Sequence, residues 1–211
     1  MESINNEIWC HTASGNAFYL LNPKSSQIDF INDIAPQLSR QTRFNGATKS
    51  ILYSIAQHCV IGADVIFKET RDPVAATHFL VHDAHEAFLG DLTTPVAKAL
   101  SELGRQMGIG SLGNDISHVI STLKNKIDNA IYEAAGINGP SKEMKIIIKN
   151  MDLRMIATEK RDLLNKSKLP WTADIENTNP INGITISPWK ADYASAQWIE
   201  RLKRYCPIAI M

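Results

Sequence analysis

Apolar residues recur every three or four positions along most of the chain, which is the spacing of one face of an α-helix. Segment 27–39 follows this pattern, and Pro36 within it is expected to split or kink the helix. Segment 72–88 is apolar almost all round, which predicts one buried central helix. Further helices are predicted over 49–67, 114–135, 141–166 and 189–205.

Turn-forming residues separate the predicted helices. Residues 8–21 hold two short apolar runs around a Thr-Ala-Ser-Gly-Asn turn, so we expect a small β-hairpin there. Loop 90–96 leads into another helix, for which Thr94 is the expected N-cap and Pro95 the first helical residue. The whole pattern predicts a mostly α fold, a helical bundle with a small N-terminal β-hairpin. Other turn-rich connections are predicted at 40–48, 108–113 and 167–187.

Composition narrows the class of protein. The 211 residues fit a single domain over 1–211. Lys plus Arg (22) equals Asp plus Glu (22), which argues against a surface that binds nucleic acid but not against a small phosphorylated ligand. The three cysteines form no CxxC pair, so we expect no disulfide scaffold and a cytoplasmic protein. No signal-peptide pattern is present, and no apolar run reaches the ~18 residues of a membrane span.

The candidate chemistry lies among the histidines, four of which fall between positions 58 and 85. His82 and Asp83 are adjacent in an apolar helix, where a carboxylate beside an imidazole is costly unless a cation compensates. Neighbouring helical positions diverge by about 100°, so both side chains can bind one ion only if it lies between helices. His58 on the preceding helix can complete such a site. Asp152, a carboxylate in another apolar stretch, needs the same compensation.

The other histidines have simpler expected roles, because a single histidine on an apolar helix face is usually a hydrogen-bonded core residue. We expect His78 in the core or behind the ligands, and His85 to be exposed or hydrogen-bonded. His11 and His118 are expected to take no part in the site. Glu86 lies one helical turn beyond His82, so it can flank the same cavity without binding the ion.

The order His58, His82-Asp83, Asp152 resembles the H…HD…D pattern of the HD phosphohydrolase superfamily. The segments TRFNG (42–46), YSIAQH (53–58), HDAHEAFLGDLTTPV (82–96) and KNMD (149–152) are similar to one branch of it. That branch contains bacterial HD-type 5′-deoxynucleotidases and phage-encoded dATP triphosphohydrolases. The resemblance covers roughly residues 27–165 and implies an HD-domain bundle there. It is weaker in the hairpin at 8–21 and in the C-terminal helix at 189–205.

Two departures from the branch concern the substrate. The branch often has Arg-Trp where this chain has Arg43-Phe44, which keeps an aromatic face for a base but removes the indole N–H. The Pro-Val-Lys of the branch is extended here by one residue, so that Lys98 follows Pro95 at a different spacing.

The resemblance implies a divalent cation held by His58, His82, Asp83 and Asp152. Two imidazoles and two carboxylates favour Co, Mn or Zn, with Fe, Ni and Mg as alternatives. Such an ion would polarise a phosphate and lower the pKa of a bound water. Glu86 is the candidate for orienting that water or relaying its proton. Asp91 resembles the acid of the family that holds the nucleophile or protonates the leaving oxygen.

Several residues are candidates for binding the substrate. Arg43 can grip a phosphate bidentately, and Lys149, one helical turn before the last ligand, can neutralise a phosphate beside the metal. A triphosphate needs more cations, for which Lys98 and Lys49 are the nearest. Phe44 is a candidate for the sugar or base pocket, although loop aromatics are as often anchors of the core.

We therefore expect a metal-dependent deoxynucleotide phosphohydrolase, with dATP cleaved to nucleoside and triphosphate as the favoured reaction. The alternative is a 5′-deoxynucleotidase that acts on dNMPs. More distant alternatives are an HD hydrolase of another phosphate ester and a non-catalytic metal-binding module. The expected partner is a small deoxynucleotide, the expected assembly a homo-oligomer, and the expected location the cytoplasm, that of the host if the chain is phage-encoded.

Overall fold

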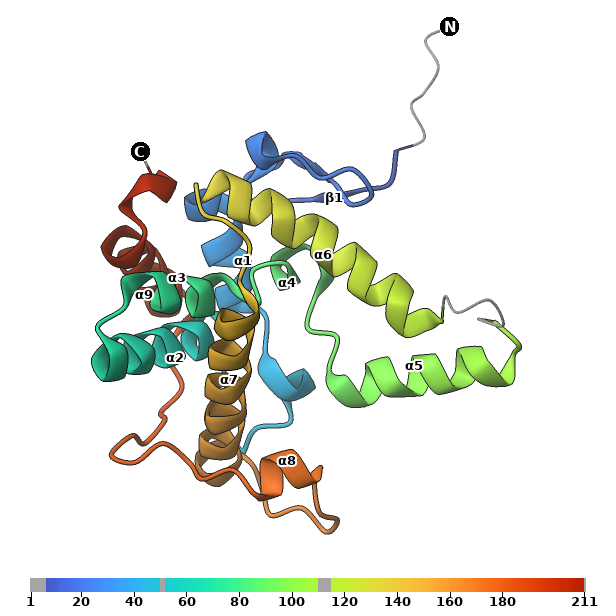
Figure 1. The fold of residues 1–211 in the computed structure, drawn as a ribbon, viewed down its shortest axis with the longest axis vertical. Helices are drawn as coiled ribbons and strands as arrows, with labels where there is room; N and C mark the ends of the chain where they lie inside the picture. Colours follow the sequence, from blue (N-terminus) through green and yellow to red (C-terminus); the bar gives the residue numbers. More distant parts are fainter. Residues whose placement is uncertain (1–6, 50–51, 110–114, 211) are drawn as a thin grey trace, which may run out of the picture.

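A computed structural model describes residues 7–49, 52–109 and 115–210 of the chain as a helical bundle with one β-hairpin (Figure 1). This confirms the predicted mostly α fold. In the hairpin, β1 (Trp9–His11) pairs antiparallel with β2 (Ala17–Tyr19), and Cys10 lies opposite Phe18. Within the described ranges, no helix is long and apolar enough to cross a membrane.

The core of the bundle is made by helices that are far apart in the sequence. α2 (Ile55–Thr70) packs along α3 (Pro73–Val81), and α9 (Ala191–Tyr205) contacts both (Figure 1). α7 (Lys142–Leu163) crosses α2 and α3, and α1 (Ala35–Arg40) packs against α9. The predicted helices at 141–166 and 189–205 are therefore confirmed within a few residues.

One glycine sets how closely α2 approaches α3. A Cβ placed on Gly62 would overlap the ring of Phe79. Phe79 also stacks on the imidazole of His82, with ring centroids 4.4 Å apart, and lies 5.6 Å from that of His58. The small residue thus lets one aromatic ring support both histidines from the core side.

The helix predicted over 49–67 begins later, at Ile55, and ends at Thr70. Ser54 caps it by accepting a hydrogen bond from the Gln57 N–H at 3.2 Å, which satisfies one of the free donors of the first turn. Leu52, expected on the apolar face, is 61% exposed. Residues 50–51 lie outside the described ranges.

The prediction of a single helix over 72–88 was wrong. α3 ends at Val81, turns occupy 82–85, and a short α4 spans Glu86–Leu89. Through this break, backbone N–H groups bond three residues back: Ala84 to Val81 and Glu86 to Asp83, the latter at 2.9 Å. Side chains three apart eclipse one another in such tight turns, so the break changes which side chains face the same cavity.

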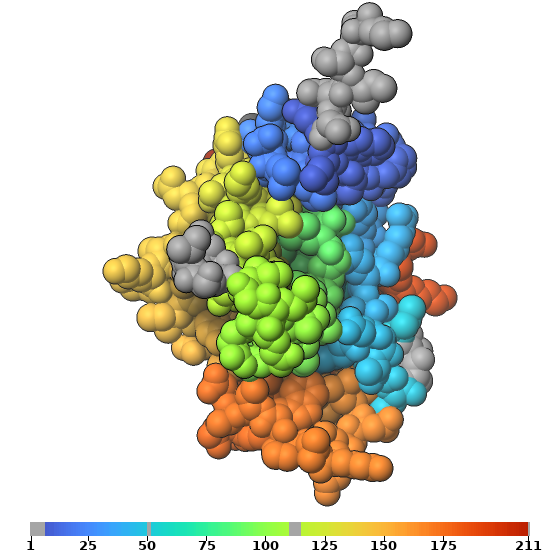
Figure 2. Space-filling view, turned by 90° about the vertical axis from the view of Figure 1, so that its right-hand side faces the viewer, coloured from blue at the N-terminus to red at the C-terminus, as the bar shows by residue number. Residues whose placement is uncertain are grey.

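The remaining helices form the ends of the molecule. α5 (Thr94–Gln106) and the far half of α6 (Ile116–Ala134) project from the bundle (Figure 1), and Figure 2 shows α5 on the surface between the hairpin and the segment after α7. The N-cap of α5 is Thr93, and Pro95 is the second helical residue, so the predicted cap was one position late. Part of the expected connection at 108–113 lies outside the described residues.

Short helical turns complete the chain. Residues Phe30–Ile34 form a π-helical turn that runs directly into α1, and Pro36 lies in the first turn of α1. The helix type changes just before Pro36, but the backbone stays helical there, so the proline does not split the element. The turn-rich segment 167–187 contains only the short α8 (Ala173–Glu176). Further 3-10 turns lie at Ser25–Gln27, Arg43–Gly46 and Pro207–Ile210.

Candidate metal centre

The imidazoles of His58 and His82 are buried and oriented by hydrogen bonds. His58 Nδ1 donates to Glu159 Oε1 at 2.7 Å, and His82 Nδ1 donates to the Phe79 carbonyl at 2.6 Å. Each Nε2 is buried and has no hydrogen-bond partner among the described residues. Metal-binding histidines are usually held in this way, with the second nitrogen free for the ion.

Two carboxylates face these free nitrogens. Asp83 Oδ2 lies 3.1 Å from His82 Nε2 and 3.9 Å from His58 Nε2. Asp152 Oδ1, from α7, lies 3.5 Å from His58 Nε2. Donor atoms of His58, His82 and Asp83 fall within 4.8 Å of one another, and Asp152 adjoins this group through His58. The four side chains expected from the sequence therefore meet at one place.

These separations fit the ligand shell of one ion. With metal–ligand bonds of about 2.1 Å, neighbouring donor atoms of an octahedral ion lie roughly 3 Å apart and opposite ones roughly 4.2 Å. Burial alone would raise the pKa of Asp83, but His82, His58 and Arg43 hold it well below its usual range. The pKa of His82 is raised, because Asp83 outweighs the effect of burial. An ion would displace the proton that this pair holds.

The protein's own cation at this place is Arg43. Its Nε donates to Glu159 Oε2 at 3.2 Å, its Nη1 lies 3.4 Å from Asp83 Oδ2, and its Nη2 lies 3.8 Å from Asp152 Oδ1. Its side chain is only 11% exposed, so the guanidinium is used mainly to balance carboxylates. Although burial opposes its charge, Glu159, Asp152 and Asp83 raise the pKa of Arg43.

Glu159 was not among the site residues expected from the sequence. Its side chain is fully buried, and it holds both His58 and Arg43. Burial opposes its charge, but Arg43 and His58 lower its pKa. Glu159 follows Asp152 by seven residues on α7, which is two helical turns, so it shares a face with that carboxylate. That spacing was the signal available in the sequence.

The two acids proposed for catalysis lie beside the group. Glu86 is 5% exposed, and burial, with Asp83 and Asp91 adding to it, raises its pKa to about 9. Burial also raises the pKa of Asp91, which is partly exposed in the loop before α5. Arg43 and Lys124 oppose both shifts, so Lys124 of α6 is a second nearby residue that the sequence analysis missed.

A cavity of about 800 Å³ lies between α5 and α6, starting next to Asp91 at Leu92. Lys98 and Lys124 line it, together with Arg105, whose guanidinium is paired with Glu102 at 2.6 Å. Its volume is in the range of pockets that enclose small ligands. Of the lysines expected at the substrate, Lys98 lines this cavity.

Two other expected substrate lysines lie elsewhere. Lys49 is exposed, its N–H donates to the Leu163 carbonyl, and its Nζ lies 3.5 Å from the Asp162 carbonyl at the end of α7. Lys149 is exposed on α7. Phe44 has a positive φ of 56°, and its ring lies 6.1 Å from that of Trp171 and beneath the Arg43 guanidinium at 5.5 Å.

The remaining histidines divide as follows. His78 is buried against the Tyr132 ring, and burial lowers its pKa, so it belongs to the core. His11 and His118 are exposed. His85 is buried rather than exposed, and its Nδ1 lies 2.9 Å from Asp128 Oδ1, so the hydrogen-bonded alternative holds.

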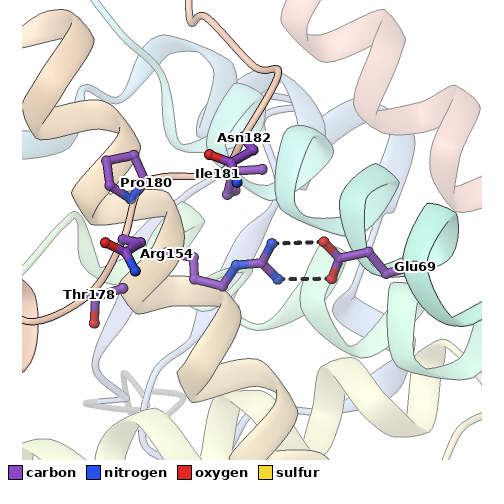
Figure 3. Close-up of a pocket in the computed structure, with 7 residues that line it drawn as sticks. Glu69, Arg154, Thr178, Pro180, Ile181 and Asn182 are labelled. Carbon is purple, nitrogen blue, oxygen red and sulfur yellow. Dashed lines mark hydrogen bonds and ion pairs between the residues drawn. The ribbon is translucent and has the colours of Figure 1, made fainter.

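A second cavity, of about 380 Å³, lies on the other side of α7 and contains none of the expected site residues (Figure 3). Arg154 and Glu69 line it and pair with each other through two hydrogen bonds of 2.7 and 2.8 Å. Arg154 is two residues beyond Asp152, so the two side chains point to different faces of the helix. This cavity offers no unpaired charge among its described residues.

Fold and site together define a mostly helical protein with a buried histidine and aspartate group that could hold a metal ion. The chain belongs to the family of the Escherichia coli protein YfdR, with which it is 33% identical over 182 residues, 85% of this chain and 87% of YfdR. An uncharacterised Rhodobacter capsulatus protein is 35% identical over 100 residues, 44% of this chain and 49% of that protein. YfdR is itself uncharacterised, and no family model matches the chain.

Proposed function

We propose that this chain is a metal-dependent phosphohydrolase of the HD superfamily that acts on deoxynucleotides. One observation carries the proposal: the buried, unpartnered Nε2 atoms of His58 and His82 face the carboxylates of Asp83 and Asp152. Ring nitrogens and carboxylates gathered in this way inside a protein are unfavourable unless protons or a metal cation lie between them. A purely structural role would not require the two further acids beside them.

His58, His82, Asp83 and Asp152 would hold the ion. When bound, a divalent cation supplies Lewis-acid stabilisation of a phosphoryl oxygen and a water of lowered pKa. Glu159 keeps the His58 ring in the tautomer that leaves Nε2 free, and the Phe79 carbonyl does the same for His82. The chain thus fixes the ligands before any ion arrives.

Glu86 and Asp91 are the candidates for moving protons. Both have raised pKa values, Glu86 to about 9, so Glu86 holds a proton near neutral pH in the metal-free protein. An acid of this kind can protonate a leaving oxygen, and its conjugate base can orient an attacking water. Asp91 is the more accessible of the two and directly precedes Leu92, which lines the 800 Å³ cavity.

We favour a deoxynucleoside triphosphate as substrate, with dATP first and triphosphate as the released product. The support is the cavity between α5 and α6, because Lys98 and Lys124 line it and no carboxylate is within ion-pair distance of either in the described residues. Phe44 offers an aromatic face that can stack on adenine without demanding a hydrogen-bond pattern.

The alternative is a 5′-deoxynucleotidase that acts on dNMPs and releases orthophosphate. It is favoured by the positions of two lysines expected at the substrate. Lys49 contacts the end of α7, and Lys149 is exposed to solvent. Fewer cations near the substrate suit a smaller phosphate group.

The test is an activity screen of all dNMPs and dNTPs with Mn, Co, Zn or Mg added to metal-stripped protein. Ion-exchange chromatography separates intact triphosphate from orthophosphate. We expect triphosphate from dATP and metal dependence throughout. Hydrolysis of dAMP with dATP left intact would replace the first reaction by the second, and no hydrolysis with any metal would overturn the proposal.

A further inference from the structure

A second group of donor atoms lies next to the first. A carboxylate oxygen of Asp83, a ring nitrogen of His85 and a carboxylate oxygen of Glu86 fall within 4.8 Å of one another. Asp83 and Glu86 are three residues apart, a spacing that already shares one helix face, and the tight turns after α3 align the two side chains more closely still. An uninterrupted helix would have spread the three side chains over a wider arc.

His85 and Glu86 are each only 5% exposed, yet His85 Nε2 and Glu86 Oε2 lack a hydrogen-bond partner in the described chain. Buried polar atoms are rarely left in this state. All three members of the group offer lone pairs to the same small space. A cation, or a proton shared among them, is what such an arrangement lacks.

His85 is also oriented as a ligand would be. Its Nδ1 lies 2.9 Å from Asp128 Oδ1 of α6, so the ring donates its proton to that carboxylate and keeps the Nε2 lone pair free. Glu159 holds His58 in the same manner in the first group. Two buried histidines with carboxylates behind them therefore flank Asp83 from different sides.

We propose that Asp83, His85 and Glu86 hold a second divalent cation, so that Asp83 is shared between two ions. This inference deepens the proposed function and rests on it for the first ion. Pairs of ions about 3.5–4 Å apart are a known arrangement for phosphoester hydrolysis, in which the attacking and leaving oxygens are stabilised together. One imidazole and two carboxylates form a harder donor set than the first group, which suits Mn or Mg.

The role of Glu86 changes when the second ion is present. Because its carboxylate lies within 4.8 Å of the donor atoms of Asp83 and His85, Glu86 would then be a ligand and not a proton-transfer group. Asp91, which is not part of either group, is then the remaining acid. His85 and Asp128 gain a function as ligand and positioning residue.

The test measures manganese bound per chain by mass spectrometry of the metal after equilibrium dialysis, with electron paramagnetic resonance of the loaded protein. We expect two equivalents and an exchange-coupled signal in the unmodified protein. Glu86→Gln, which keeps the side-chain volume, and His85→Gln should each bind one equivalent and show an uncoupled six-line signal. His118→Gln, which alters an exposed histidine, should still bind two. Circular dichroism checks that each variant is folded.

The outcomes separate this inference from the proposed function. One equivalent in the unmodified protein that His58→Gln removes would overturn the second ion and leave the first. No bound manganese, cobalt or zinc would overturn both. Two equivalents retained in both Glu86→Gln and His85→Gln would place the second ion elsewhere and overturn the assignment to these residues.

Discussion

Helix α7 carries charged side chains on two faces, and the surroundings of these charges differ between the two faces. On one face, Arg154 pairs with Glu69 through two hydrogen bonds at the surface, with side-chain exposures of 33% and 46% (Figure 3). On the other face, Asp152 and the fully buried Glu159 surround His58, whose Nε2 has no partner in the described chain. On the first face each charge has a partner of opposite sign, whereas the second face includes a buried nitrogen without a hydrogen-bond partner among the described residues.

The difference is why we propose the metal site at the buried face. A solvated ion pair such as Arg154–Glu69 contributes little to stability and leaves neither charge without a partner. Buried ring nitrogens beside carboxylates need protons or a metal ion between them. The cavity next to Arg154 therefore offers no unpaired charge among its described residues, whereas the candidate metal centre contains buried nitrogen atoms without a hydrogen-bond partner there.

The largest expected effect comes from removing a shared ligand. Asp83→Asn should abolish turnover and the thermal stabilisation by metal, because Asp83 faces both histidines. At a hundred times its Kd, a bound ion adds about 2.7 kcal/mol, or roughly 5–10 °C in Tm for a chain of this size. Differential scanning fluorimetry with and without metal measures this. Asp174→Asn, at an exposed aspartate, is the control, and full activity of metal-stripped Asp83→Asn would contradict the site.

The next effect separates proton transfer from metal binding. Asp91→Asn should lower kcat by about 10²–10⁴-fold, the usual contribution of a general acid or base. Metal content should not change, because Asp91 lies outside both donor groups. Steady-state kinetics and metal analysis of the same preparation check the two together. Loss of the metal with the activity would instead make Asp91 a ligand.

A smaller effect is expected from changing Glu159, the residue that holds His58 in place. Glu159→Gln keeps the volume but removes the charge that orients His58 and pairs with Arg43. Metal affinity should fall by about 10–100-fold, the usual effect of such a change. Competition with a chromophoric chelator measures the Kd. An unchanged Kd would mean that His58 is held in place by packing alone.

Periodicity predicted most of the helices because an amphipathic face is a local property. It could not predict the break after Val81, since a stretch that is apolar all round carries no mark of where hydrogen bonds shift from four residues to three. The break matters because its tighter turns align Asp83 and Glu86 more closely than an α-helix would. The start of α2 was missed for a related reason: Ser54 caps the helix, while the apolar pattern continues before it.

The four side chains that meet at the candidate metal centre could be predicted because each is a polar group in an apolar stretch of sequence. The residues that complete the site could not, since Asp128 and Lys124 are ordinary residues of an exposed helix until α6 packs beside His85 and Glu86. Arg43 was expected at a phosphate, but packing places its guanidinium among carboxylates.

The lysines give a fourth, more modest prediction. Lys98→Ala should raise KM for dATP about threefold to tenfold, the effect of losing roughly 0.7–1.4 kcal/mol at a charged contact. It should scarcely change KM for dAMP, because we expect Lys98, which lines the 800 Å³ cavity, to contact phosphates that a monophosphate lacks. Lys49→Ala is the matched control, since that side chain lies at the end of α7. Equal effects of the two variants would remove the cavity from the substrate path.

The smallest effect should come from the face of α7 on which Arg154 and Glu69 form an ion pair. Arg154→Ala breaks a partly exposed ion pair with Glu69, and such pairs contribute about 0.2–1 kcal/mol. Chemical denaturation should therefore detect a slight loss of stability, while metal content, kcat and KM stay the same. The combined variant Arg154→Ala with Glu69→Ala should cost little more than either change alone, because either single change already removes the interaction between the two side chains. A large loss of activity in Arg154→Ala would mean that the 380 Å³ cavity takes part in the reaction, and the contrast between the two faces of α7 would no longer hold.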